Sequence, residues 1–249
     1  MPTSFPTALR VPPATLARPP RRGARLALAA ILVVGLAVGL VFGFWPQLDL
    51  AVTAQIYDAA QRAWPYAYTP SLQGIRDVND AVVRGVAVAA GLVLILRLAV
   101  PRIARERLPA GLSLRAALFV LATLAVAPGL IINGLLKPHG GRPRPIEVTQ
   151  FGGTLDFVPW WSPYGRCDGN CSFASGEMSS AMWLLAVAVL LPPRWRPLGV
   201  ALVLLWAATV GGVRIAMGGH FASDVLMSAV LTALTVWVLH ALIMRPRPA

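Results

Sequence analysis

The residues best able to do chemistry lie in three short polar stretches of an otherwise apolar sequence. In chain order they are Lys137 and Arg144, then Ser175-Gly176-Glu177, then Arg214, His220 and Asp224. Three cations on separate segments suit a phosphate group, whose charge is spread over three non-bridging oxygens. The residue types therefore indicate chemistry on phosphate.

The second and third stretches add specific roles to this set. Ser175-Gly176 at a helix start would supply a hydroxyl, free backbone N–H groups and the positive end of the helix dipole. His220 and Asp224 are four residues apart, so on a helix they share one face. An aspartate that accepts a hydrogen bond from one imidazole nitrogen leaves the other free to attack phosphorus. The carboxylates and histidines are not arranged as a metal centre, so we expect no cofactor.

The composition defines what must hold these residues in place. The chain has 249 residues, of which 57% are hydrophobic and 13% charged, with a mean hydropathy of +0.66. Soluble proteins carry about 25% charged residues and lack long apolar runs. The composition excludes a disordered chain, a disulfide-stapled miniprotein and an ordinary soluble enzyme, and it predicts an integral membrane protein.

Six apolar segments are expected to form an all-α bundle of six membrane-spanning helices. Their approximate ranges are 26–44, 81–100, 116–136, 178–191, 198–213 and 221–244. A helix needs roughly 20 residues to cross the hydrocarbon core. The fourth and fifth segments are short, and the fourth reaches that length only by including residues 173–176. Each polar stretch begins or ends one of these segments.

The charges predict the orientation of the bundle. One side carries 14 basic residues and one acid, and the other carries eight basic residues and nine acids, giving net charges of +13 and −1. An excess of Lys and Arg marks the cytoplasmic side. We therefore expect both termini in the cytoplasm and the polar cluster outside. This asymmetry explains the pI near 11.4 without nucleic-acid binding, because no basic stripe with interleaved aromatic residues occurs.

The remaining segments are expected to be accessory. Residues 1–25 are rich in Pro and Arg and predict a disordered cytoplasmic tail, which leaves 26–244 as the membrane domain. The first apolar run ends in bulky residues at 43–45, which favours a retained anchor over a cleaved signal peptide. Weak helical periodicity over 49–64 favours a short helix on the outer membrane surface, with an ordinary loop as the alternative.

Cys167 and Cys171 are the only cysteines, and both fall in the outer 137–177 loop. An oxidising compartment permits a small disulfide there. Metal binding would require more ligands in local spacing. We expect a disulfide that stiffens the approach to Ser175, with two free thiols as the alternative.

The three stretches together resemble the signature of the type 2 phosphatidic acid phosphatase (PAP2) superfamily. The matching residues are Lys137-x6-Arg144-Pro145, Ser175-Gly176 and Arg214-x5-His220-x3-Asp224. The resemblance implies that His220 is the nucleophile, that it forms a phosphohistidine, and that Asp224 orients it. It also implies that the phosphoryl group binds Lys137, Arg144, Ser175, the Gly176 N–H and Arg214 without a metal. Arg142 also precedes a proline, but the family spacing selects Arg144.

The sequence departs from the family pattern at the expected proton donor. The family's Pro-Ser-Gly-His is Ala174-Ser175-Gly176-Glu177 here, and Val213 replaces the Ser before Arg214. By position, Glu177 would protonate the leaving oxygen, provided that the site keeps its proton bound. The alternative is a carboxylate that stabilises the N-terminus of a helix.

The resemblance implies a lipid phosphatase in a bacterial inner membrane, with its active site facing the periplasm and a phosphorylated membrane lipid as substrate. Of the lipids that such proteins dephosphorylate, we favour the lipid A phosphate, because a bulky anionic lipid suits a cationic outer loop. Undecaprenyl pyrophosphate, phosphatidic acid and phosphatidylglycerophosphate are the alternatives. A non-enzymatic lipid-phosphate binder or transporter and a lipid phosphotransferase are competing classes of function.

The charge map predicts which loops can be labelled from outside. Single cysteines placed between Lys137 and Glu177 in a Cys167→Ser/Cys171→Ser background should react with an impermeant thiol reagent from the periplasm. Cysteines in residues 194–196 should react only after the cytoplasmic side is opened. Labelling in the reverse order would contradict the predicted orientation.

Overall fold

The long apolar runs form the long helices of the structure, a computed structural model that describes residues 22–99 and 113–244. These helices are α1 (Arg22–Phe44), α3 (Pro70–Ala99), α5 (Leu114–Leu124) with its π-helical continuation η1 (Ala125–Leu136), α9 (Arg196–Ala216) and α10 (Ala222–Ile243). The shorter helices are α2 (Gln47–Ala54), α6 (Lys137–His139), η2 (Pro145–Glu147), η3 (Thr149–Phe151), α7 (Gly176–Trp183) and α8 (Leu185–Ala188). Within the described ranges every regular element is helical, which confirms the all-α prediction.

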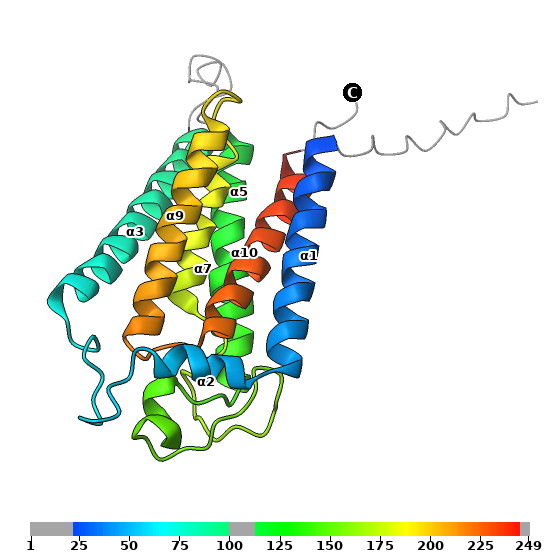
Figure 1. Ribbon diagram of the computed structural model, residues 1–249. Helices are drawn as coiled ribbons and strands as arrows, with labels where there is room; N and C mark the ends of the chain where they lie inside the picture. Colours follow the sequence, from blue (N-terminus) through cyan, green and yellow to red (C-terminus); the bar gives the residue numbers. More distant parts are fainter. Residues whose placement is uncertain (1–21, 100–112, 245–249) are drawn as a thin grey trace, which may run out of the picture.

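Five helices of the described part are long and apolar enough to cross a membrane. They are Arg22–Phe44, Pro70–Ala99, Leu114–His139, Arg196–Ala216 and Ala222–Ile243. They run side by side as a bundle (Figure 1). Residues 1–21 of the expected tail lie outside the described residues, and α1 begins at Arg22, earlier than the predicted start of the membrane domain.

The fourth expected span is not one continuous helix. It consists of α7 and α8, which are separated at Leu184, and neither is among the five long helices. Figure 1 shows α7 enclosed by α3, α5, α9 and α10, and residue contacts join it to each of them. A helix surrounded by other helices faces little lipid. This placement explains why the segment is short and why it contains the small polar residues Ser179 and Ser180.

Helix α3 begins 11 residues before the predicted start of the second span, at Pro70 rather than residue 81. Apolarity alone marks the part that crosses hydrocarbon, whereas the helix continues into the polar layer. The added turns carry Gln73, Arg76, Asn79 and Asp80 on the side of the bundle where α7 begins. The outer end of α3 is therefore polar enough to contribute to a site.

The surface helix expected over residues 49–64 is shorter than predicted. It is α2, which ends at Ala54 and is followed by turns that include an isolated bridge between Asp58 and Ala63. Helix α2 lies across the end of the bundle where α10 begins, beside the loop that follows α6 (Figure 1). Its Asp49 and Thr53 are fully buried, so this helix is packed against protein.

The core of the bundle is built around α7. Trp183 is fully buried, and its indole N–H donates to Val120 O at 3.0 Å and to Thr123 Oγ1 at 3.1 Å on α5. On the other side, Asn79 of α3 donates to Ser180 Oγ at 2.9 Å and accepts from Trp206 Nε1 of α9 at 3.0 Å. These bonds satisfy buried polar groups, fix α7 against α5 and α3, and join α3 to α9.

The π-helical turn delivers Lys137 to the start of α6. Pro128 lies inside η1 and has no N–H to donate, and a proline ring clashes with the regular α-helical ladder. Asn133 Nδ2 donates to Pro128 O at 2.6 Å and so satisfies a carbonyl within the wider turn. The segment ends at Leu136, directly before the predicted phosphate-binding lysine.

Two adjacent glycines of α9 test how tightly α7, α9 and α10 pack. A Cβ on Gly211 would lie 2.6 Å from Val225 Cγ1 and 3.2 Å from Met178 Sδ, whereas a Cβ on Gly212 would meet nothing within 4 Å. Gly211→Ala should therefore destabilise the bundle by about 1–3 kcal/mol through overpacking. Gly212→Ala should be neutral or stabilising by up to about 1 kcal/mol, because Ala favours helix.

The measurement is the thermal unfolding midpoint of both purified variants in the same detergent. Equal midpoints for the two variants would contradict the close packing of α9 against α10.

Candidate active site

The three polar stretches meet at one end of the bundle. Lys137 follows η1, Ser175 caps α7, Arg214 lies in the last turn of α9, and His220 and Asp224 lie just before and in the first turn of α10. The loop from Gly140 to Ala174 covers this end and carries Arg144. All the residues predicted for the site therefore lie together, on separate segments as expected.

His220 is held as a neutral imidazole with one defined tautomer. Its side chain is 2% exposed, and Nδ1 lies 2.7 Å from the carbonyl oxygen of Ser172. A carbonyl can only accept, so Nδ1 carries a proton, and in the neutral form of the ring Nε2 then keeps its lone pair. Burial, followed by the positive charges of Arg214, Arg144 and Lys137, lowers the pKa of His220 well below its usual value. A neutral imidazole with a free Nε2 is the form that can act as a nucleophile.

The partner of His220 differs from the sequence prediction. Asp224 was expected to accept the hydrogen bond from His220, but its Oδ2 lies 3.9 Å from Nδ1. Asp224 Oδ2 instead accepts from Ser172 Oγ at 2.6 Å and from Phe221 N at 2.9 Å, and Oδ1 pairs with Arg142. The i, i+4 spacing placed the two side chains on the correct face, but it did not reveal that Ser172 stands between them.

The two arginines of the cationic loop have different environments. Arg142 is fully buried, pairs with Asp49 and Asp224, and lies over the Phe221 ring at 4.4 Å. Arg144 faces the site and donates from Nε and Nη2 to Asn170 O at 3.2 and 2.9 Å. The structure therefore places Arg144, and not Arg142, where a phosphate group can reach it.

The disulfide loop lies against two of the cations. Cys167 and Cys171 form a disulfide, the pairing that the sequence favoured. Between them, Asn170 accepts from Lys137 Nζ through its side-chain oxygen at 2.9 Å and from Arg144 through its backbone oxygen. The oxygens of Asn170 thus occupy positions on Lys137 and Arg144 that phosphate oxygens would take.

The start of α7 and the end of α9 lie beside these cations. Ser175 is the N-cap of α7, and a Cβ on Gly176 would lie 3.0 Å from Asn133 Oδ1 and 3.5 Å from Lys137 Nζ. A side chain at this position would therefore crowd Asn133, whereas Lys137 would be in ordinary contact with it. Arg214 Nε is buried without a hydrogen-bond partner. A buried donor without an acceptor is costly, and an incoming anionic oxygen would satisfy it.

Glu177 is part of an ion pair that the sequence did not reveal. Arg76 of α3 donates to it from Nε at 2.9 Å and from Nη2 at 2.8 Å, and Arg214 Nε lies 3.5 Å away. An ion pair needs the charged carboxylate, whereas a proton donor must carry a proton. In this structure Glu177 is therefore an ion-pair partner of Arg76 and Arg214, and a role as proton donor would require that pair to open.

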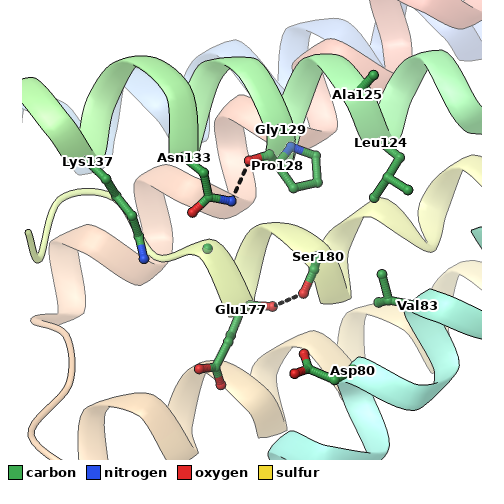
Figure 2. A pocket seen from close by; sticks show the side chains of 11 residues that line it. Asp80, Val83, Leu124, Ala125, Pro128, Gly129, Asn133, Lys137, Glu177 and Ser180 are labelled. Atoms are coloured by element: carbon green, nitrogen blue, oxygen red, sulfur yellow. Dashed lines mark hydrogen bonds between the residues drawn. The ribbon is translucent and has the colours of Figure 1, made fainter. Parts of the chain in front are cut away.

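Two cavities flank this ion pair. The larger, about 520 Å³, lies between α3, η1 and α7, and its lining is shown in Figure 2. Lys137 and Glu177 point into its outer end, Asp80 and Ser180 lie one turn deeper, and Val83 and Leu124 form an apolar inner part. The smaller, about 250 Å³, is lined by Arg76, Arg144 and Arg214. One cavity is suited to the apolar part of a substrate and the other to anionic groups.

Comparison with known proteins agrees with this geometry. The model of the PAP2 superfamily matches residues 116–248. The lipid A 4'-phosphatase of Francisella tularensis subsp. novicida is 39% identical over 138 residues, which cover 53% of this chain and 60% of that protein. The lipid A 4'-phosphatase of Rhizobium leguminosarum is 40% identical over 107 residues, 43% of this chain and 46% of that protein. The chain thus spans about half of the length of these relatives.

Two further matches are weaker in sequence. Phosphatidylglycerophosphatase B of Escherichia coli is 39% identical over 72 residues, 27% of this chain and 28% of that protein. A crystal structure of a transmembrane PAP2-type phosphatidylglycerolphosphate phosphatase from Bacillus subtilis superposes with a TM-score of 0.54 at 17% identity, covering 88% of this chain and 94% of that one. At that identity the superposition shows a shared fold. With the family model matching more than half of its residues, the chain belongs to the PAP2 superfamily.

Proposed function

We propose that the protein is a membrane phosphatase that removes a phosphate from a lipid through a phosphohistidine intermediate, without a metal. The observation that carries this proposal is the state of His220. It is buried, its proton lies on Nδ1, and three cations lie close enough to lower its pKa. A buried imidazole beside three cations supports the roles proposed for His220 as the nucleophile and for the cations as the phosphoryl-binding groups.

The proposed reaction has two steps. In the first, His220 Nε2 attacks phosphorus, a P–N bond forms, and the P–O bond to the lipid breaks as its oxygen takes a proton. In the second, water attacks phosphorus, the P–N bond breaks, and inorganic phosphate leaves. Lys137, Arg144 and Arg214 neutralise the phosphoryl oxygens in both steps.

We propose Glu177 as the group that gives and later takes back the proton. The incoming phosphate dianion competes with Glu177 for Arg76 and Arg214, so substrate binding itself weakens the ion pair. In the second step the carboxylate can accept the proton of the attacking water. Arg76 would then act on the phosphoryl group as a fourth cation.

We propose the 4'-phosphate of lipid A as the substrate. Two lipid A 4'-phosphatases share about 40% identity with this chain over more than 100 residues each. The cavity beside Lys137 offers an apolar inner part for acyl chains and polar side chains nearer the site. Phosphatidylglycerophosphate is the second candidate, since the matching E. coli enzyme acts on it by name, over a shorter region. We place the site on the periplasmic face of the inner membrane because of the charge asymmetry.

The nucleophile is tested by variants at His220 and Asp224. Purified protein in mixed micelles with lipid A should release inorganic phosphate in the presence of a chelator, and mass spectrometry should show loss of the 4'-phosphate. His220→Ala should abolish turnover, and Asp224→Asn should reduce it less, because Asp224 does not contact the reacting atoms. Vanadate should inhibit, since it can adopt the five-coordinate geometry of the transition state.

Matched micelles containing phosphatidylglycerophosphate or undecaprenyl pyrophosphate identify the preferred lipid. Wild-type turnover by the His220→Ala variant, or activity that returns from chelation only with a divalent metal, would refute the mechanism. Phosphate appearing on an added lipid acceptor, and not in solution, would identify a phosphotransferase. Lipid binding without phosphate release would identify a binding protein.

The role of Glu177 is tested by comparing leaving groups. General-acid loss typically costs roughly 10²–10⁴ in rate. Glu177→Gln should therefore slow turnover of the lipid strongly but spare an aryl phosphate, whose leaving group needs little protonation. Asp77→Asn is the matched control, because Asp77 is an exposed carboxylate next to Arg76 on α3.

A purely structural ion pair would give a different pattern. In that case Arg76→Gln and Glu177→Gln should reduce the turnover of both substrates equally. Full lipid turnover by Glu177→Gln would remove Glu177 from the mechanism.

A further inference from the structure

A buried charge network connects the surface helix α2 to the proposed active site. Asp49, Arg142 and Asp224 come from α2, the cationic loop and α10, and their side chains are 0% exposed. Arg142 Nη2 donates to Asp49 Oδ2 at 2.7 Å, and Nη1 pairs with Asp224 Oδ1. Arg142 therefore joins two carboxylates that lie on different helices.

The rest of this network leaves no charged group unsatisfied. Arg142 Nε donates to Val158 O at 3.0 Å, and Nη1 also donates to Ser223 Oγ at 2.8 Å. Asp49 accepts from the backbone N–H of Ser223 at 2.9 Å and from its hydroxyl at 2.6 Å. Removing one partner of such a buried set leaves an uncompensated charge. Each member therefore restricts the positions of the others.

Ser172 carries the restraint from Asp224 to His220. Its hydroxyl donates to Asp224 Oδ2 at 2.6 Å, its N–H donates to Arg142 O at 2.8 Å, and its carbonyl accepts from His220 Nδ1 at 2.7 Å. Three hydrogen bonds thus fix this one residue. Because the carbonyl of Ser172 determines the tautomer of His220, whatever holds Ser172 also holds the nucleophile.

We propose that Asp49, Arg142 and Ser172 are positioning residues for His220, acting in series through Asp224. This inference rests on the proposed function, in which His220 attacks phosphorus. Attack makes the imidazole cationic, and its Nδ1–H then donates more strongly to the Ser172 carbonyl. The carboxyl groups of Asp49 and Asp224 both face the guanidinium of Arg142, and Asp224 Oδ2 accepts from the hydroxyl of the same Ser172 whose carbonyl contacts His220. The network orients His220 and stabilises its Nδ1–H electrostatically, and no proton moves along it.

The network also has a simpler interpretation, which the experiment must separate from positioning. Asp49 could serve only to dock α2 on α10, since it accepts two hydrogen bonds from Ser223. Docking alone would make the loss of Asp49 a stability defect. If Asp49 instead positions His220 through Asp224, the loss of Asp49 should lower turnover, and it should do so only while Asp224 is present.

A double-mutant cycle at Asp49 and Asp224 distinguishes these roles. The loss of groups that orient a functional histidine typically costs 10–100-fold. In Asp49→Asn we expect kcat for lipid dephosphorylation to fall by about that factor, with KM changed less than about twofold. The Asp49→Asn/Asp224→Asn double variant should lie within about threefold of Asp224→Asn alone, because residues acting through one path are not additive.

Two matched controls remove buried hydrogen bonds to backbone oxygens of Asp49 and Asp224 and leave the side chains of the network unchanged. Thr53→Val acts on the same helix, where Thr53 Oγ1 donates only to the backbone oxygen of Asp49 at 2.8 Å. Ser228→Ala removes a buried hydroxyl that donates to the backbone oxygen of Asp224 at 2.8 Å. Both should keep kcat within about twofold of wild type. Ser172→Ala should lower kcat as Asp49→Asn does, and Ser172→Thr, which keeps the hydroxyl, should recover part of it.

Two outcomes would overturn the proposal. In one, the rate losses of the two single variants multiply in the double variant. In the other, Asp49→Asn lowers the unfolding midpoint but its folded protein keeps the wild-type kcat. If Asp49→Asn yields no folded protein, Ser172→Ala and Ser172→Thr take its place. Positioning then predicts that Ser172→Ala lowers kcat with little change in KM and that Ser172→Thr recovers part of the loss. If the wild type releases no phosphate, the proposed function fails, and ¹⁵N chemical shifts of His220 become the readout. The Nδ1–H tautomer should then dominate in wild type and decline in Ser172→Ala, and an unchanged tautomer would refute positioning.

Discussion

The hydrogen bond from His220 to the carbonyl of Ser172 is the constraint on which the rest of the site depends. A buried histidine near three cations has no strong reason to keep a particular tautomer or ring orientation. The carbonyl supplies both, because it accepts only from a protonated Nδ1. Asp224 and Arg142 hold Ser172 through its hydroxyl and its N–H, and Arg214, Arg144 and Lys137 lie close enough to His220 to lower its pKa.

The bundle meets this constraint by separating its charges into two layers. The inner layer, Asp49–Arg142–Asp224, is fully buried and internally paired, so it is rigid and inaccessible to substrate. The outer layer, Lys137, Arg144 and Arg214, has partners that an anion can replace, such as Asn170 and Glu177. Arg142 and Arg144 are only two residues apart, with Pro143 between them. This short rigid spacing directs one guanidinium to each layer.

Much of this arrangement could be predicted because the chemistry is local in sequence. Apolar length indicated the helices, and the spacing from Lys137 to Arg144 and from Arg214 to Asp224 indicated the candidate site. Asp49, Arg76 and Ser172 could not be found in this way, because each acts through a partner about 50 to 100 residues away and none belongs to a short pattern. The break at Leu184 was missed for a related reason. A helix enclosed by four others need not satisfy the length that lipid imposes, and hydropathy does not reveal that enclosure.

Asn170 has a consequence for how the site treats small anions. Lys137 and Arg144 both donate to oxygens of Asn170 in the same chain, so an anion that binds them must displace these oxygens. A weakly charged anion such as chloride or a carboxylate gains little by displacing them, whereas a phosphate dianion held by several cations at once gains much more. In the proposed reaction, the short loop between Cys167 and Cys171 would therefore compete with anions for Lys137 and Arg144, and it would favour release of inorganic phosphate.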